Sequence, residues 1–310
     1  MGRPCRCSYI SGDRIVTLVL QTLVSTLVQG SILALITIGM SLVYGTLRVL
    51  NMAQGVMVMV GGMAAWVFVA QWGLPVWASL LFAAAVAFAL GVLTYYTAVR
   101  PLLGRLGVDF EMTAFISTFA IATIIQSVVL AGFGPRQRSF PELITGRVDL
   151  VSGVSITYHS LLMAALAIVA LLALGAFLTR SRYGLAITAV AQDIDAARLL
   201  GIPATRVYVI TIGLAAALAG IAGVLLAPIY FVYPNAGDLP LLQAMIVAIF
   251  AGLGSVRGTI IAAYVIGFVQ AAVSIYWSST YALPVLYAVI LVVLLVRPWG
   301  IDGKPQEARL

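Results

Sequence analysis

The chain has 310 residues, of which 63% are hydrophobic and only 9% are charged, with a formal net charge of +7. Soluble domains carry about 25% charged residues, so these values exclude a soluble enzyme, a soluble nucleic-acid-binding protein and a disulfide-stabilised secreted domain. Asp, Glu, Lys and Arg are absent from long stretches at 15–47, 49–99, 112–135, 150–179, 207–237, 239–256 and 258–296. A bilayer-spanning helix needs roughly 20 apolar residues. The sequence therefore predicts an all-α, polytopic helical membrane protein with the lipid bilayer as its solvent.

The apolar stretches predict about nine membrane spans, with a range of eight to ten. Stretch 49–99 must hold two helices, because Gly73 and Pro75 interrupt it, and stretch 258–296 breaks in the same way between Trp277 and Pro284. The expected spans are 16–37, 54–71, 76–98, 112–132, 160–179, 207–229, 239–253, 258–276 and 284–296. The seventh and ninth are short, and each is either a half-helix or a re-entrant segment.

The polar segments indicate one transmembrane domain over 1–310, with polar tails at 1–14 and 297–310. The first tail resembles the start of a signal peptide. No small-residue cleavage site follows a short apolar core, however, so the first apolar run is interpreted as a retained span. Cys5 and Cys7 supply only two ligands where a zinc site needs at least three, and they are interpreted as incidental.

Basic residues predict the orientation of the chain. Under the nine-span count, one side receives Arg48, Arg100, Arg105, Arg180, Arg182, Arg198, Arg206, Arg257, Arg297, Lys304 and Arg309. The other side receives Arg136, Arg138 and Arg147, so the first side is expected to be cytoplasmic. Arg3, Arg6 and Arg14 point the other way. A mis-assigned start or a first segment that lies in the membrane interface would explain that conflict.

The residue types that the predicted spans lack argue against several classes of transporter and enzyme. The predicted spans contain no Asp, Glu, Lys or Arg, which mark proton relays and voltage sensors in membranes, so a proton-coupled carrier is disfavoured. Sodium coupling through backbone carbonyls stays open. His159 is the only histidine and is expected at the outer interface. A Walker phosphate loop is excluded, because Lys304 is the only lysine and Pro298 replaces the first glycine of that motif. The chain is therefore expected not to be an enzyme and to hold no cofactor.

The loop at 180–206 contains a predicted amphipathic helix. Its apolar residues recur at helical spacing: Ala186, Ile187, Val190, Ile194, Ala197 and Leu200 or Gly201. Gly201 suits the end of this helix, and Pro203 suits the start of the next span. Two interpretations are open: a surface helix that only bridges two spans, and a helix that docks in the groove of a partner protein.

Two Gly-rich interruptions lie in corresponding halves of the chain. One surrounds Arg48 and Asn51, and the other surrounds Arg257. Paired interruptions are typical of a transport path, because irregular backbone survives in a membrane only when it is buried or lines a cavity. The alternative is that the glycines permit close helix packing. The candidate pathway residues are Asn51, Gln54, Gly55, Thr118, Gln126, Gln243, Gly252 and Gly254.

Three motifs carry a resemblance to a known family. D-A-A-R-L-L-G at 195–201 resembles the E-A-A-x-x-x-G loop of bacterial ABC importer permeases, with Asp in place of Glu. V-Y-G-T-L-R-V-L-N-M-A-Q-G at 43–55 and G-L-G-S-V-R-G-T-I-I-A-A at 252–263 are similar to segments of the branched-chain amino-acid importer permeases. Their order and spacing match from about residue 16 to 303. On these motifs the chain is identified as a member of that family.

The resemblance implies the membrane subunit of an ATP-driven importer of branched-chain or related amino acids in the bacterial inner membrane. It also implies a second related permease, cytoplasmic ABC ATPases that bind ATP and magnesium, and an extracytoplasmic solute-binding protein, with no nucleic-acid partner. Contact with the ATPases is expected through Gln192, Asp193, Asp195, Ala196, Ala197, Arg198 and Gly201.

The sequence departs from the family at 51–56. Family members commonly read N-F-A-H-G-E there, whereas this chain reads N-M-A-Q-G-V, so Gln54 replaces His and Val56 replaces Glu. That change leaves the solute open among branched-chain amino acids, other hydrophobic amino acids, and urea or short amides. The alternative function is an autonomous channel or secondary carrier for a small neutral solute.

Overall fold

A computed structural model describes residues 10–103, 109–144, 146–150, 154–297 and 300–301. Cys5, Cys7 and most of both polar tails lie outside these residues. The long helices are α1 (Ile10–Leu47), α2 (Gln54–Trp66) with η1 (Val67–Gln71), α3 (Val76–Thr94) with η2 (Tyr95–Val99) and η3 (Arg100–Leu102), α4 (Phe110–Phe133), α5 (Tyr158–Arg180), α8 (Ala204–Tyr230) and α10 (Val256–Tyr276). The shorter elements are β1 (Arg147–Leu150), β2 (Val154–Thr157), α6 (Arg182–Gln192), α7 (Ile194–Leu199), α9 (Asp238–Ala251), η4 (Ser279–Tyr281) and α11 (Ala282–Val296).

The predicted helical membrane fold is confirmed. Within the described residues, seven helical segments are long and apolar enough to cross a membrane, and α9 and α11 are shorter apolar helices. Each of the nine expected spans overlaps one of these segments. The 14 residues of α9 rise about 21 Å, less than the roughly 30 Å of a hydrocarbon core. This length agrees with a half-helix at the seventh position.

The first span is longer than expected. The prediction ended it at residue 37, but α1 runs without a break for 38 residues, from Ile10 to Leu47. Gly39 and Gly45 do not interrupt it, because each lies where another segment packs closely on α1: Gly39 against Gln54 and Ala215, and Gly45 against Gly254. Since α1 is one helix from Ile10, the described residues contain no separate first segment that lies in the membrane interface.

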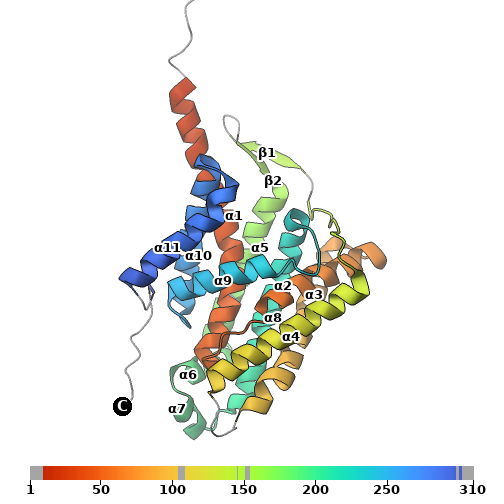
Figure 1. Ribbon diagram of the computed structural model, residues 1–310, viewed down its shortest axis with the longest axis vertical. Coiled ribbons are helices and arrows are strands. Elements are labelled where there is room, and N and C mark those ends of the chain that lie inside the picture. Colours follow the sequence, from red (N-terminus) through yellow and green to blue (C-terminus); the bar gives the residue numbers. More distant parts are fainter. Residues whose placement is uncertain (1–9, 104–108, 145, 151–153, 298–299, 302–310) are drawn as a thin grey trace, which may run out of the picture.

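The two ends of the molecule differ in structure. A small antiparallel hairpin of β1 and β2, which pairs Arg147 with Thr157, lies near one end, and α6 and α7 lie at the opposite end (Figure 1). The hairpin was not predicted; it lies in the loop expected on the outer side. Helix α1 starts at the hairpin end and projects beyond the other helices there (Figure 1). The 38 residues of α1 rise about 57 Å, which is more than the roughly 30 Å of a hydrocarbon core. The first turns of α1 therefore extend past the core.

His159 is the second residue of α5, directly after the hairpin strand β2, and the sequence predicted it at the outer interface of this span. Its side chain is only 2% exposed, whereas Tyr158 and Leu161 beside it are 45% and 40% exposed, so His159 lies on the face of α5 that packs against the protein.

The centre of the fold consists of α1, α2 and α8, which are the most buried of the seven long segments, whereas α4 is the least buried. Small residues bring α2 and α8 into contact. Gly61 lies against the backbone of Gly220, and Gly223 lies against the carbonyl of Val58 and the amide of Gly62. The close-packing interpretation therefore holds for the glycines of α8.

Gly223→Ala should lower the free energy of unfolding by about 1–3 kcal/mol, because its new Cβ would overlap the Val58 carbonyl oxygen and lie 3.0 Å from the Gly62 nitrogen. The matched control is Gly175→Ala in α5, where a Cβ would have no neighbouring atom within 4 Å. Unfolding by denaturant in detergent micelles measures both variants. Equal stability of the two variants would contradict this packing.

Candidate functional site

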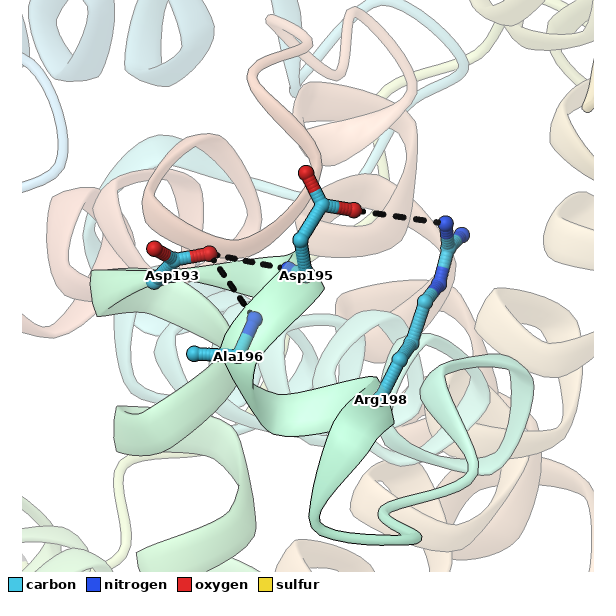
Figure 2. A network of polar contacts seen from close by, with 4 residues as sticks. All are labelled: Asp193, Asp195, Ala196 and Arg198. Atoms are coloured by element: carbon cyan, nitrogen blue, oxygen red, sulfur yellow. Dashed lines mark hydrogen bonds and ion pairs between the residues drawn. The ribbon is translucent and has the colours of Figure 1, made fainter.

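The predicted docking helix is two helices with a break at Asp193. Asp193 has an extended backbone, and its Oδ1 accepts hydrogen bonds from the amides of Asp195 at 2.9 Å and Ala196 at 3.1 Å (Figure 2). Aspartate is a favoured N-cap, so it ends α6 and starts α7. The prediction of one continuous helix was therefore wrong. Because Asp193 shapes this loop, a substitution there alters the fold of the loop as well as its surface charge.

The apolar face of the loop is largely as predicted. Ile187, Val190 and Ala197 are buried against the protein. Gly201 has a φ of +79°, which favours glycine, and Pro203 precedes the first residue of α8. Leu200 departs from the prediction. It was expected on the buried face, but α7 ends at Leu199, and the turn directs Leu200 away from the core.

Two leucines protrude from this loop and were missed as contact residues. Leu199 is 90% exposed and Leu200 is 80% exposed. The residues beside them, Asp195 and Arg198, form an exposed ion pair at 3.8 Å (Figure 2), and such a surface pair contributes little to stability. Six of the predicted coupling residues are exposed: Gln192, Asp193, Asp195, Ala196, Arg198 and Gly201. The loop thus presents two leucines among polar groups, a composition typical of a contact site for another protein.

The first interruption is a non-helical segment at 48–53, which is buried or half-buried except at the exposed Arg48. Asn51 is 3% exposed, and its Oδ1 accepts a hydrogen bond from the Ala53 amide at 3.0 Å. The hydroxyl of Thr118 in α4 accepts a hydrogen bond from the Met52 amide at 3.3 Å. Asn51 and Thr118 therefore bind the segment itself. Irregular backbone at this position is buried in protein, as a membrane requires.

Gln54 joins three helices. It starts α2, is fully buried, and donates hydrogen bonds from Nε2 to the carbonyl of Ala215 in α8 at 3.1 Å and to that of Ile36 in α1 at 3.4 Å. Gly55 beside it packs against Gly237 and Leu241 at the start of α9. Both residues hold helices together at the point where α2 begins.

The second interruption joins α9 to α10. Gly252 and Gly254 both have a φ of +90°, a conformation that L side chains rarely adopt. A Cβ on Gly254 would lie 3.1 Å from the Cα of Gly45, so this turn contacts the last turns of α1 directly. The second interruption thus lies against the last turns of α1, which lead directly into the first interruption.

A cavity of about 580 Å³ lies at the hairpin end, between α1, α2, α8, α9 and α10. We call it the hairpin-end cavity. Its polar lining residues include Gln21, Ser25, Gln29, Ser160, Gln243, Gln270 and Ser274. Asp, Glu, Lys, Arg and His are absent from the described residues that line it. Its volume falls within the range of small-molecule sites, about 300–1,000 Å³.

Of the eight predicted pathway residues, Gln243 lines this cavity and the other seven do not. Gln126 in α4 instead donates from Nε2 to the carboxylate of Asp238 at 3.4 Å, at the start of α9. The sequence carried a signal for the missed residues: Gln21, Ser25 and Gln29 recur every four residues along one face of α1. Among the described residues, no group of three or more His, Cys, Asp or Glu is placed to hold a metal ion.

Comparison with known proteins decides the family. The family described as "Branched-chain amino acid transport system / permease component" matches residues 22–295. The chain belongs to this family. It is a permease subunit rather than a catalytic one, and its apolar helices and family membership make it a multi-pass protein of the bacterial inner membrane.

Relatives match this permease over nearly its full length. The high-affinity branched-chain amino acid transport system permease protein BraD of Pseudomonas aeruginosa is 32% identical over 94% of this chain and 98% of BraD. The corresponding protein LivH of Escherichia coli K12 is 33% identical over 94% of this chain and 97% of LivH. The ribose import permease protein RbsC of Escherichia coli K12 is 26% identical over 93% of this chain and 87% of RbsC.

Proposed function

We propose that the chain forms a single permease domain that imports branched-chain or related amino acids. It acts with a second related permease, with cytoplasmic ABC ATPases that bind and hydrolyse ATP with magnesium, and with an extracytoplasmic solute-binding protein. The α6–α7 end faces the cytoplasm, and the hairpin end faces outward. The relatives BraD and LivH, named for branched-chain amino acid transport, support this choice of solute.

The observation that carries the proposal is the exposed Leu199–Leu200 pair at the tip of the α6–α7 loop. Two adjacent leucines at 90% and 80% exposure are unfavourable in water, and a groove on an ATPase would bury them. Ala197 is the buried residue through which α7 contacts the permease core, and Gln192, Asp193, Asp195, Ala196, Arg198 and Gly201 surround the leucines. Movement of an ATPase would therefore be transmitted through α7 to α8.

The solute route is proposed to enter the hairpin-end cavity past Gln243 and to continue toward the two interruptions. Asn51, Gln54, Gly55 and Thr118 shape the first interruption through the contacts described above, and Gly252 and Gly254 shape the second. Gln126 fixes the start of α9 through Asp238. Because α9 borders both the cavity and the second interruption, a shift of α9 would alter the route along its length.

Uptake in cells tests the choice of solute. Deletion of this gene should reduce uptake of labelled leucine, isoleucine and valine at micromolar concentration by at least tenfold, and the intact gene should restore it. Uptake of urea should stay unchanged. Normal leucine uptake together with lost urea uptake would overturn the assignment.

A further inference from the structure

We propose that Gln29, Gln243 and Gln270 form a neutral amide subsite that binds the ammonium and carboxylate groups of a zwitterionic amino acid. This inference rests on the proposed function, because it assumes that the hairpin-end cavity holds the transported solute. Beyond that function, the inference names the residues that bind the solute and explains why a neutral solute is preferred. We call these three residues the amide subsite.

The three glutamines come from three helices around one cavity. Gln29 lies in α1, Gln243 in α9 and Gln270 in α10, and all three line the hairpin-end cavity. Helices α1 and α10 approach closely beside them, because a Cβ on Gly267 would lie 2.8 Å from the Cα of Gly30. Ser25 and Ser274 lie one turn further along the same two helices and line the same cavity. The polar side chains thus converge from separate parts of the chain.

The amides of the subsite have no protein partner. Gln270 is only 7% exposed, yet its side chain makes no hydrogen bond with any described residue, and the same holds for Gln29 and Gln243. Gln54, the buried glutamine outside the cavity, donates two hydrogen bonds from Nε2, although its Oε1 has no partner among the described residues. Gln29 and Gln243 are half-buried, and no amide atom of the three glutamines is among the fully buried polar atoms that lack a partner, so the amides are open to the cavity. The cavity therefore leaves its hydrogen-bonding capacity to whatever occupies it.

The serines of the cavity resemble its glutamines in lacking a protein partner among the described residues, a property that the buried Thr37 and Ser41 of α1 share outside the cavity. Thr22 and Thr26 in α1 and Thr211 in α8 each donate to a carbonyl of their own helix. Ser25, Ser160 and Ser274 line the cavity and form no side-chain hydrogen bond among the described residues. Hydroxyls that would ordinarily bond to their own helix remain available to an occupant.

Neutral amides suit both ends of an amino acid. A glutamine NH2 group donates to a carboxylate, and its Oε1 accepts from an ammonium group. The described residues that line the cavity include no charged side chain, so a solute with a net charge would lose hydration without a counter-ion there. A zwitterion carries its two charges close together and needs no counter-ion. We therefore expect neutral amino acids to bind and lysine or glutamate to be excluded.

The rest of the cavity suits an aliphatic side chain. Its apolar wall includes Ile32, Leu33, Ile36, Val58, Met59 and Leu226. Branched aliphatic groups gain free energy in proportion to the apolar area that they bury. One end of a leucine molecule would contact the amides, and the other end would contact this wall.

Uptake by site variants tests the subsite in vesicles that contain the full importer with its ATPases and binding protein. Gln270→Leu and Gln243→Leu should each reduce ATP-driven leucine uptake at least tenfold, since each removes a hydrogen bond to a charged group. The shorter amide of Gln270→Asn should retain part of the uptake. The control is Gln71→Leu, an exposed glutamine at the end of η1 that does not line the cavity.

A second measurement reports binding without transport. Ser274→Cys, in a chain with Cys5 and Cys7 replaced by serine, should react with a membrane-impermeant thiol reagent added from outside. Leucine should protect this cysteine, whereas lysine, glutamate and urea should not. Addition of Gln270→Leu should abolish the protection and leave the reactivity.

The outcomes separate the subsite from the proposed function. If the unaltered importer takes up leucine and the Gln270→Leu and Gln243→Leu variants take it up equally well, the subsite alone would be overturned. Protection by urea but not by leucine would overturn both. Loss of uptake in the variants without leucine protection of Ser274→Cys would show that the glutamines support the fold rather than the solute, and would also overturn the subsite.

Discussion

Replacing Leu199 and Leu200 together with serine should abolish solute-stimulated ATP hydrolysis and ATP-driven uptake, while the permease remains in the membrane. The two side chains are 90% and 80% exposed, so their removal leaves the core of this chain intact. Burial of one leucine contributes about 1.5–3 kcal/mol. Loss of both should therefore weaken ATPase binding roughly 100-fold or more. Co-purification with the ATPases and vesicle uptake measure the effect.

The control for this variant keeps the apolar surface. Leu199→Met with Leu200→Met preserves hydrophobicity and approximate volume, so uptake should stay within about twofold of the original. Normal coupling in the serine variant would contradict docking through these leucines. Asp193 is a poor test of docking, because it caps α7, and its loss changes the loop itself.

Gln54→Glu should prevent stable assembly of the permease. Gln54 is fully buried, and its Nε2 donates to the carbonyls of Ile36 and Ala215. A carboxylate at this position would face two carbonyl oxygens without a donor. An unpaired buried charge costs about 3–5 kcal/mol or more. We expect a large fall in the thermal unfolding midpoint in detergent and little protein in the membrane.

Gln54→Leu distinguishes the charge from the lost hydrogen bonds. It removes the two donated bonds but adds no charge, and the expected cost is about 1–3 kcal/mol. The leucine variant should therefore remain foldable, with a smaller decrease in the unfolding midpoint. Equal stability of the glutamate variant and the original chain would contradict the contacts assigned to Gln54.

The membrane fold was predictable because lipid imposes a simple demand on composition. Long runs without charge had to become helices, and the breaks at Gly73–Pro75 and before Pro284 were visible as helix breakers. The end of α1 was not predictable in the same way. The predicted span ended at residue 37, before Gly39 and Gly45, but these glycines lie inside the helix because Gln54 and Gly254 pack closely on it there.

The contact loop was partly predictable. The family motif located it, and its apolar spacing identified the buried Ile187, Val190 and Ala197. The break at Asp193 was not predicted, because the apolar spacing continues through this residue. Its side chain caps the start of a new helix, and that cap ends the preceding one. That break, with the turn at Gly201, is why Leu200 points outward.

The cavity was largely missed because the candidate pathway was inferred from irregular backbone. Gln29 and Gln270 lie within continuous helices, where no glycine or proline draws attention to them. Their four-residue spacing from Ser25 and Ser274 was the available signal. Which polar faces meet around one space depends on helix packing, and a single sequence does not specify that.

Reconstitution with and without the ATPases tests most directly whether this chain is a permease driven by ATP. Vesicles that contain this chain, its partner permease, the ATPases and the binding protein should accumulate labelled leucine only when ATP is supplied. Vesicles that contain this chain alone should show no leucine or urea flux above that of empty vesicles. Downhill flux of either solute through the chain alone would contradict the account and establish an autonomous channel or carrier.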